Sequence, residues 1–258
     1  MQFCPPADTY PRFSEDGTKV AFSRSREPWV SQRNFDKWDA WVLDLATGEE
    51  TLVATNAYQA CWSGNDLLFF VGDGGRKLAA AVVGRPHAAT FLKSGVPPLD
   101  EGVLVTLPDR RFSEGEDDFA LTLRGKRRAT AFFSMGNAEL GVPRSIREVA
   151  GGCQMVWMSP EHSDEVAWID HPGRGGNAIY ARRADEGPRV LLDAPEPWSH
   201  EYFPRFCGRW LVYGASTGGH EQDSEDYEIF LWDTEHTDAP PARLTFHTGN
   251  DCWPDHWW

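Results

Sequence analysis

A short motif that opens a strand recurs along this chain, and this repeat limits the fold more than any other feature of the sequence. Tyr10-Pro11-Arg12-Phe13 near the start returns as Phe203-Pro204-Arg205-Phe206 near the end. The two copies are separated by roughly four periods of 40–50 residues. Weaker copies stand between them, at Tyr58–Ser63, Gly102–Pro108 and Gln154–Pro160.

Each copy is followed by further segments with the alternating pattern of strands. The predicted second strands are Asp66–Gly72, Phe119–Gly125, Glu165–His171 and Arg209–Ser216. The predicted third strands are Ala40–Asp44, Ala129–Met135, Ala178–Arg182 and Glu228–Asp233. The predicted fourth strands are Thr51–Ala54, Arg189–Leu192 and Arg243–Thr245. Each repeat therefore supplies four strands.

Four strands per unit at a period near 48 residues are typical of the blades of a β-propeller. We therefore predict an all-β protein, a propeller of four-stranded blades. Five blades fit the repeat count best and six are the alternative, with the ring closed by pairing of the N- and C-terminal segments. A β-sandwich also has short strands, but it does not repeat a strand opening at one fixed period. No segment has the pattern of an amphipathic helix.

We assign the whole chain, residues 1–258, to a single propeller domain. Its repeats run over approximately 10–57, 58–101, 102–152, 153–200 and 201–250, and a terminal closing segment occupies 251–258. That segment contains Asp251-Cys252-Trp253-Pro254, which repeats the opening of the first repeat, Asp8-Thr9-Tyr10-Pro11.

The first and last repeats resemble the WD-like repeats of TolB-type propellers. One resemblance is the pattern aromatic-Pro-x-aromatic-Ser-x-Asp-Gly at Tyr10–Gly17, and another is the Arg-Leu-Thr and Asn-Asp-x-aromatic-Pro junction at Arg243–Pro254. The resemblance implies the propeller fold. It implies little about function, since such repeats occur in protein-binding scaffolds, in the propeller domains of peptidases and in polysaccharide lyases.

Charge and hydropathy exclude several classes of partner. The formal net charge is −14, and this repels nucleic acid phosphates and anionic lipid. No run of apolar residues is long enough to span a membrane, and residues 1–10 do not resemble a signal peptide. We expect a monomer that binds no nucleic acid and does not insert into membranes. The expected location is cytoplasmic, or periplasmic or secreted if a signal peptide was removed.

Polar residues stand where the innermost strand of each predicted blade begins. They are Asp8, Asn56, Asp100 or Glu101, His200 with Glu201, and Asp251, with Gly152 at the remaining position. In a propeller these positions surround the central tunnel. Oxygen ligands from several segments suit calcium, so Asp8, Glu201 and Asp251 are candidate metal ligands. The alternative is that these acids only cap turns between blades.

Two long insertions supply further candidates. Residues 27–38 carry three aromatics, and Trp29 and Trp38 are candidates for stacking on a sugar or anchoring a peptide; they could equally fold back over the blade edge. The acidic run Glu221–Glu228 is either a solvated loop or a docking surface for a cationic partner.

Catalytic motifs are weak. Gly214–Gly218 matches the G-x-S-x-G nucleophile elbow, but no helix is predicted after it, so we interpret it as a turn. Gly72–Gly75 lacks the ending of a phosphate loop. We name no catalytic residue.

The sequence favours a non-catalytic scaffold that presents a tunnel mouth and blade loops to a protein, peptide or glycan. The main alternative is a metal-dependent polysaccharide lyase or a hydrolase-like enzyme with its site at the tunnel, using His200, Glu201 and His247. A third class is a propeller that regulates access to another domain.

Overall fold

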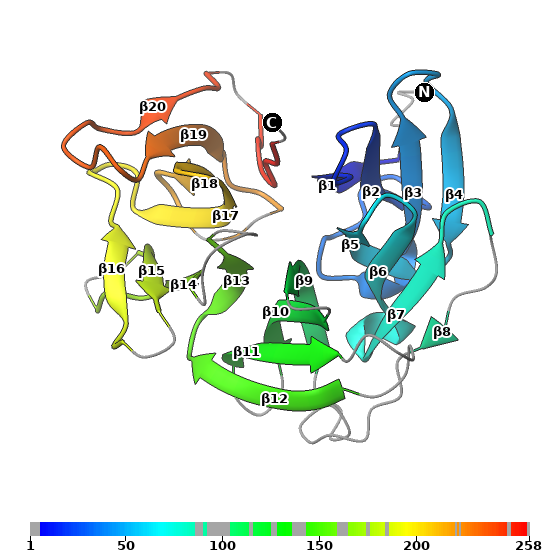
Figure 1. Ribbon diagram of the computed structural model, residues 1–258. Coiled ribbons are helices and arrows are strands. Elements are labelled where there is room, and N and C mark those ends of the chain that lie inside the picture. Colours follow the sequence, from blue (N-terminus) through cyan, green and yellow to red (C-terminus); the bar gives the residue numbers. More distant parts are fainter. Residues whose placement is uncertain are drawn as a thin grey trace. The chain divides into compact units, whose positions relative to one another are not determined.

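In the computed structural model the strands of the described residues form five four-stranded sheets (Figure 1). Contacts divide the chain into two compact units, residues 1–149 and residues 150–258. The structure describes residues 6–85, 90–91, 104–113, 116–124, 128–135, 143–158, 165–173, 176–183, 186–219, 221, 223–246 and 249–256.

The first unit contains three of the sheets. The first consists of β1 (Asp8–Phe13), β2 (Lys19–Ser25), β3 (Trp38–Asp44) and β4 (Glu50–Ala54). The second consists of β5 (Ala57–Ser63), β6 (Leu67–Gly72), β7 (Lys77–Val82) and β8 (Thr90–Phe91). The third consists of β9 (Leu104–Ser113), β10 (Glu116–Arg124), β11 (Arg128–Met135) and β12 (Pro143–Ala150).

The second unit contains the other two sheets. One consists of β13 (Cys153–Trp157), β14 (Val166–Asp170), β15 (Ala178–Arg182) and β16 (Arg189–Leu192). The other consists of β17 (His200–Cys207), β18 (Trp210–Ser216), β19 (Glu228–Asp233) and β20 (Ala242–Arg243). The described residues contain only two short 3-10 segments, η1 (Phe35–Lys37) and η2 (Asp73–Gly75), and none of their helices is long and apolar enough to cross a membrane.

Every sheet is a meander in which consecutive strands are neighbours. This is the topology of a propeller blade, and it confirms the prediction of an all-β propeller with four-stranded blades. β15, β16 and β19 have the bounds that the alternation predicted. The last strand is shorter than predicted: β20 ends at Arg243, because Thr245 turns its hydroxyl to the β19 backbone and accepts the Ile229 N–H. Closure by pairing of the terminal segments stays a prediction.

The sheets of the first unit pack face to face through alternating side chains. Leu68 and Phe70 of β6 join Ala21 and Val42 of the first sheet in one cluster. Phe69, between them, joins Phe119 and other residues of β10 in another. Since successive side chains of a strand point to opposite faces, the second sheet is buried on both faces.

A bulge with an unusual backbone angle marks the first strand of four sheets. The bulged residues are Tyr10, Gln59, Gln154 and Phe203, with φ of 54°, 56°, 56° and 60°. Positive φ is uncommon outside glycine, so its return at the same position in four sheets marks a recurrent feature of the blade. Trp253 has φ of 61°, although its segment forms no ladder within the described residues.

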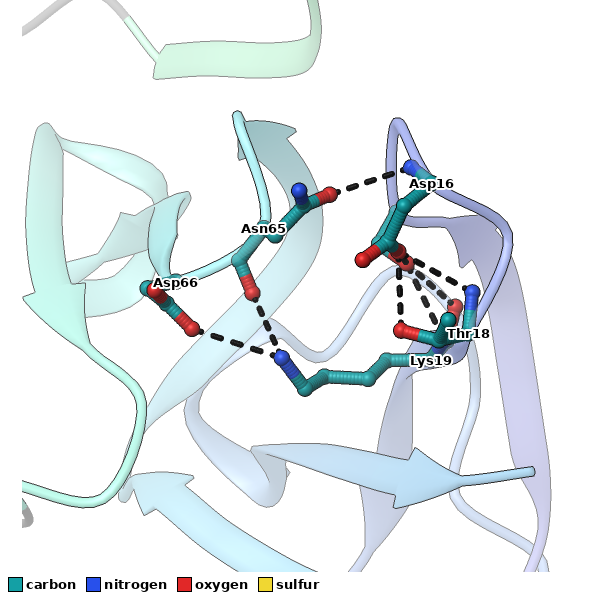
Figure 2. Close-up of polar contacts among 6 residues, drawn as sticks. Asp16, Thr18, Lys19, Asn65 and Asp66 are labelled. Carbon is teal, nitrogen blue, oxygen red and sulfur yellow. Dashed lines mark hydrogen bonds and ion pairs between the residues drawn. The ribbon is translucent and has the colours of Figure 1, made fainter. Parts of the chain in front are cut away.

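Hairpin turns fasten neighbouring sheets of the first unit (Figure 2). The Asp16 carboxylate accepts hydrogen bonds from the Ser14 hydroxyl at 2.7 Å and from the Thr18 N–H at 3.0 Å. These bonds lower the pKa of Asp16 to about 2. The Asp16 N–H donates to Asn65 Oδ1 at 3.0 Å, and Lys19 Nζ donates to the Asn65 carbonyl at 3.0 Å. The β1–β2 turn is therefore tied to the β5–β6 turn.

Candidate functional site

The positive-φ residues define a common position for the predicted tunnel residues. We call the residue two places before each of them a blade-start residue. The blade-start residues are Asp8, Ala57, Gly152, Glu201 and Asp251. Of the predicted tunnel residues, Asp8, Gly152, Glu201 and Asp251 are blade-start residues, whereas Asn56 is one residue early; that these residues line a tunnel stays a prediction. Asp100 and Glu101 lie outside the described residues.

Asp8 is a surface carboxylate that is already neutralised. Arg24 Nε and Nη2 donate to its two oxygens at 2.7 Å each. The same guanidinium donates through Nη1 to Glu50 Oε2 at 2.6 Å, which lowers the pKa of Glu50. The Asp8 side chain is 46% exposed. Its interactions are those of an ion pair across β1, β2 and β4.

Glu201 is the opposite case, a carboxyl group inside the protein. It is 0% exposed. Its Oε1 accepts the Ala194 N–H, while Oε2 is buried with no hydrogen-bond partner. Burial raises the pKa of Glu201 to about 8, and the negative charge of Asp193 adds to the effect. Glu201 is therefore protonated at neutral pH.

Acidic and phenolic groups of the second unit interact electrostatically with Glu201 or with Tyr180. Asp193 acts on both Glu201 and Tyr180, whose pKa is raised by burial and by the charges of Asp170 and Asp193. Tyr213 of β18 is also close enough for Glu201 to raise its pKa, although burial is the larger cause. Sequence reasoning missed Asp170 and Asp193. The available signal was topological: Asp170 is the last residue of β14 and Asp193 directly follows β16, and both strands end at the edge where β17 begins.

Gly152 occupies the blade-start position of β13 because no larger residue fits. Its φ is +82°, and a Cβ there would lie 2.2 Å from the Ile169 carbonyl oxygen and 3.2 Å from Asp170 Cγ. The Asp170 carboxyl group thus lies beside the backbone at the start of β13. A side chain at Gly152 would take the space that this carboxyl group now occupies.

Asp251 and His200 lie in the second unit with Glu201. The Asp251 N–H donates to the Tyr227 carbonyl at 2.9 Å. Two residues later Trp253 is 3% exposed, and its ring packs 4.0 Å from that of Phe203. His200 Nδ1 lies 3.2 Å from the Ser199 hydroxyl.

No group of three or more His, Cys, Asp or Glu side chains among the described residues could hold a metal ion. Asp8 is in the first unit, and Glu201 and Asp251 are in the second. His247 lies outside the described residues. A metal bound by Asp8, Glu201 and Asp251 stays a prediction.

Asn56 occupies a turn. It has φ of 52°, its N–H donates to Asp39 Oδ1 at 3.0 Å, and its side chain accepts from Arg26 Nη2. These contacts tie Asn56 to Asp39 and Arg26, and the turn-capping alternative stays a prediction.

The three aromatics of the insertion have different environments. Trp38 is 1% exposed and stacks on Tyr58 at 5.0 Å, and Phe35 meets the same ring edge-on at 5.4 Å. Both fold back onto the blade. Trp29 is 88% exposed, with φ of 61°. The side chain that the insertion offers to solvent is therefore that of Trp29.

The loop that carries Trp29 is braced at its base. The Arg26 N–H donates to the Lys37 carbonyl at 3.0 Å, and the Arg26 guanidinium donates to the Asp36 carbonyl. Lys37 forms an ion pair with Glu27. The Asp36 carboxylate rests against Gly74 of η2, where a Cβ would lie 2.9 Å from it. These contacts hold both ends of the loop.

The G-x-S-x-G string has the structure of a strand end. Ser216 is the last residue of β18, is 0% exposed, and donates its hydroxyl hydrogen to the Gly219 carbonyl at 2.8 Å. In the acidic run, Glu228 is buried and forms an ion pair with Arg243. The Ser224 and Glu225 N–H groups donate to the Glu221 carbonyl.

Comparisons with known proteins support the fold. No family model matches the chain, and no curated protein does. Among solved structures, putative TolB from Agrobacterium tumefaciens is 14% identical with a TM-score of 0.65, over 93% of this chain and 81% of that one. TolB from Acinetobacter baumannii is 14% identical with a TM-score of 0.59, over 89% and 52%.

An oligogalacturonate lyase in complex with manganese is also similar. It is 15% identical with a TM-score of 0.52, over 94% of this chain and 74% of the lyase. At such identities the likeness concerns the fold alone. The protein is a β-propeller that is structurally similar to TolB.

Proposed function

We propose that this chain is a non-catalytic binding scaffold of the TolB-like kind that holds a protein, peptide or glycan with the loops at its blade ends. The observation that carries the proposal is Trp29. An indole that is 88% exposed on a loop braced at both ends loses little entropy on binding, and tryptophan is enriched among residues that dominate interfaces. Its φ of 61° is an unfavourable conformation for a bulky residue, as is found at binding sites.

The experiment is a screen of glycan and peptide arrays with the purified protein, followed by affinity measurements on the hits with Trp29→Ala. We expect the variant to lose about thirtyfold or more in affinity, since truncating a dominant interface residue costs about 2 kcal/mol or more. Leu45→Ala is the matched control, because Leu45 is 48% exposed on the β3–β4 turn of the same sheet. Equal affinities for wild type and Trp29→Ala would contradict the proposal.

The second candidate is a lyase or hydrolase-like activity, and Glu201 is the observation in its favour. A carboxyl group with a pKa of about 8 can act as a general acid near neutral pH. Its complete burial counts against it. The test is incubation with oligogalacturonate and Mn²⁺, since elimination would produce an unsaturated sugar that absorbs ultraviolet light. Product formation by wild type but not by Glu201→Gln would replace the scaffold proposal.

A further inference from the structure

Two aromatic rings of the second unit face one arginine at the end of β20. The Arg243 guanidinium carbon lies 4.9 Å from the centroid of the Trp198 ring and 4.8 Å from that of the Phe246 ring. Trp198 belongs to the β16–β17 connection, and Phe246 lies three residues after β20. We call Trp198, Arg243 and Phe246 the arginine–aromatic cluster.

Buried groups hold the cluster in place. Arg243 Nη2 donates to Glu228 Oε1 at 2.5 Å and Arg243 Nε donates to the Thr245 carbonyl at 2.7 Å, while Glu228 is itself buried. The Trp198 ring meets the buried Phe230 ring edge-on at 5.1 Å. A ligand that binds here therefore immobilises few further side chains, and this lowers the entropic cost of binding.

Two parts of the cluster are accessible to solvent. Phe246 is 71% exposed, and the Arg243 side chain is 33% exposed. Arg243 Nη1 makes no hydrogen bond with any residue that the structure describes. The cluster therefore offers an aromatic ring and a fixed N–H donor next to each other.

Arg24 in the first unit shows the same arrangement in a purely structural role. Its guanidinium carbon lies 4.9 Å from the Phe22 ring centroid and 5.3 Å from that of Trp41. All three of its nitrogens donate to carboxylates, and Phe22 is buried. Arg243 differs in both respects, because one of its nitrogens bonds to no described residue and its ring partner Phe246 is exposed.

We propose that the arginine–aromatic cluster is a binding site for a neutral sugar ring. The hydroxyl oxygens of a sugar accept hydrogen bonds from a donor such as Arg243 Nη1. The C–H face of the same sugar is apolar and packs on an aromatic ring. Ligand sites commonly combine apolar and aromatic side chains with a few fixed polar groups in this way.

The charges around the cluster favour a neutral ligand over an anionic one. The positive charge of Arg243 is already balanced by Glu228. Glu196 stands two residues before Trp198, and Asp226 stands two residues before Glu228. The whole chain carries a formal net charge of −14, so an anion approaching the cluster is repelled.

The spacing within the cluster favours a small ring over an extended peptide. Peptides are recognised through rows of main-chain hydrogen bonds, through grooves or through several pockets along their length. The cluster instead presents one donor group, whose guanidinium carbon lies within 4.9 Å of both ring centroids. One sugar ring can contact the donor and an aromatic ring together.

The test measures binding of the neutral methyl glycosides of glucose, galactose, mannose, xylose and N-acetylglucosamine by saturation-transfer NMR, with calorimetry on those that bind. We expect at least one of them to bind the wild-type protein. Phe246→Ala should weaken that binding by about fivefold or more, because the ring contact is lost. Phe246→Tyr keeps the ring and should bind as wild type does. Leu244→Ala is the matched control, since Leu244 is 50% exposed two residues away, and it should leave binding unchanged.

Arg243→Lys tests the donor. Lysine keeps a positive charge for Glu228 but lacks the planar fork of nitrogens, so we expect glycoside binding to weaken severalfold. A melting curve checks that this variant is folded, and Phe246→Ala carries the test if it is not, because its exposed ring contributes little to stability.

No binding of any of these glycosides, or equal binding by wild type and Phe246→Ala, would overturn the proposal. Tighter binding of methyl glucuronide than of methyl glucoside would make the cluster an anion site and contradict the neutral ligand. If a peptide from the array screen, and no glycoside, lost affinity in Phe246→Ala, the cluster would be a peptide site and the sugar assignment wrong.

The site is independent of the scaffold proposal, which rests on Trp29 of the first unit. Trp29→Ala should bind the methyl glycoside as wild type does, and Phe246→Ala should keep the affinity for ligands that require Trp29. Failure of one proposal therefore leaves the other standing.

Discussion

Asp8 and Glu201 occupy the same place in two blades, yet their surroundings are opposite. Each lies two residues before the positive-φ residue of a first strand, Tyr10 in one case and Phe203 in the other. Asp8 is half exposed and held by Arg24, whereas Glu201 is fully buried and forms no ion pair with a described residue. One repeat position can therefore carry either a structural ion pair or an uncompensated acid.

The cross-strand neighbour decides between these outcomes. Asp8 pairs across the ladder with Arg24 of β2, while Glu201 pairs with Ala215 of β18. Directly opposite residues are close enough to interact, so Arg24 neutralises its neighbour and Ala215 cannot. The residue across the ladder thus separates a structural acid from a functional candidate better than the acid itself does.

The largest expected effect concerns Trp253, which lies two residues after the blade-start residue Asp251 and has a positive φ, as Tyr10 and Phe203 do. Trp253→Ala should lower the free energy of unfolding by about 3–5 kcal/mol, because it empties a buried site packed on Phe203. Urea unfolding measures the loss. Trp29→Ala, at a residue 88% exposed, is the control and should change stability by less than about 0.5 kcal/mol. If the urea midpoint of Trp253→Ala equalled that of wild type, the segment of Asp251 and Trp253 would contribute nothing to the stability of the fold.

The next largest effect is a dependence of stability on pH, and it concerns Glu201 alone. The pKa of Glu201 is raised from 4.5 to about 8 in the folded state, so between those values the folded protein alone holds the proton. Its contribution to stability is complete below about pH 4.5 and is lost as pH rises to about 8. The difference in unfolding free energy between wild type and Glu201→Gln should shift by a few kcal/mol between pH 5 and 9.

Measuring that difference at each pH cancels the other titrating groups. Asp8→Asn provides the matched control, and its difference from wild type should show no such fall over pH 5–9. If this difference in unfolding free energy between wild type and Glu201→Gln were the same at pH 9 as at pH 5, Glu201 would have to be ionised or exposed in the folded protein. The contrast with Asp8 would then disappear.

The smallest expected effect on stability concerns Asp8, the exposed carboxylate, and its ion pair with Arg24. Arg24→Met removes the ion pairs with Asp8 and Glu50 and also the contacts of the guanidinium with the Phe22 and Trp41 rings. We expect a loss of no more than about 1 kcal/mol at low salt, and less in 1 M salt, as for solvated ion pairs. Denaturant unfolding at two salt concentrations checks this. A loss that salt does not reduce would show that Asp8 is effectively buried.

Much of the fold could be predicted because the blade repeats its pattern. Alternation predicted the bounds of β15, β16 and β19, and the two Pro-Arg-Phe copies lie in the first strands β1 and β17. The boundaries were least certain where side chains replace ladder bonds, as at Thr245, which accepts the Ile229 N–H through its hydroxyl. A hydroxyl in that role leaves no mark in a hydropathy pattern.

The candidate site was less predictable. The repeat located Asp8 and Glu201 at equivalent places, but the sequence could not show that Arg24 is opposite one and Ala215 opposite the other, since this depends on the register across a bulge. It also treated Trp29 and Trp38 alike. Trp38 begins β3 and is buried on Tyr58, while the braced loop presents Trp29 to solvent.

The tie between the β1–β2 and β5–β6 turns has a consequence for engineering. Asp16, Lys19 and Asn65 couple adjacent sheets through short turns, so foreign residues inserted at Asn65 would break contacts of two sheets at once (Figure 2). The β2–β3 connection at the opposite edge already accommodates a long excursion between Arg26 and Lys37, closed at its base by their own hydrogen bond. A grafted peptide would therefore be tolerated within residues 28–34, whereas the same peptide inserted at Asn65 would disturb two sheets.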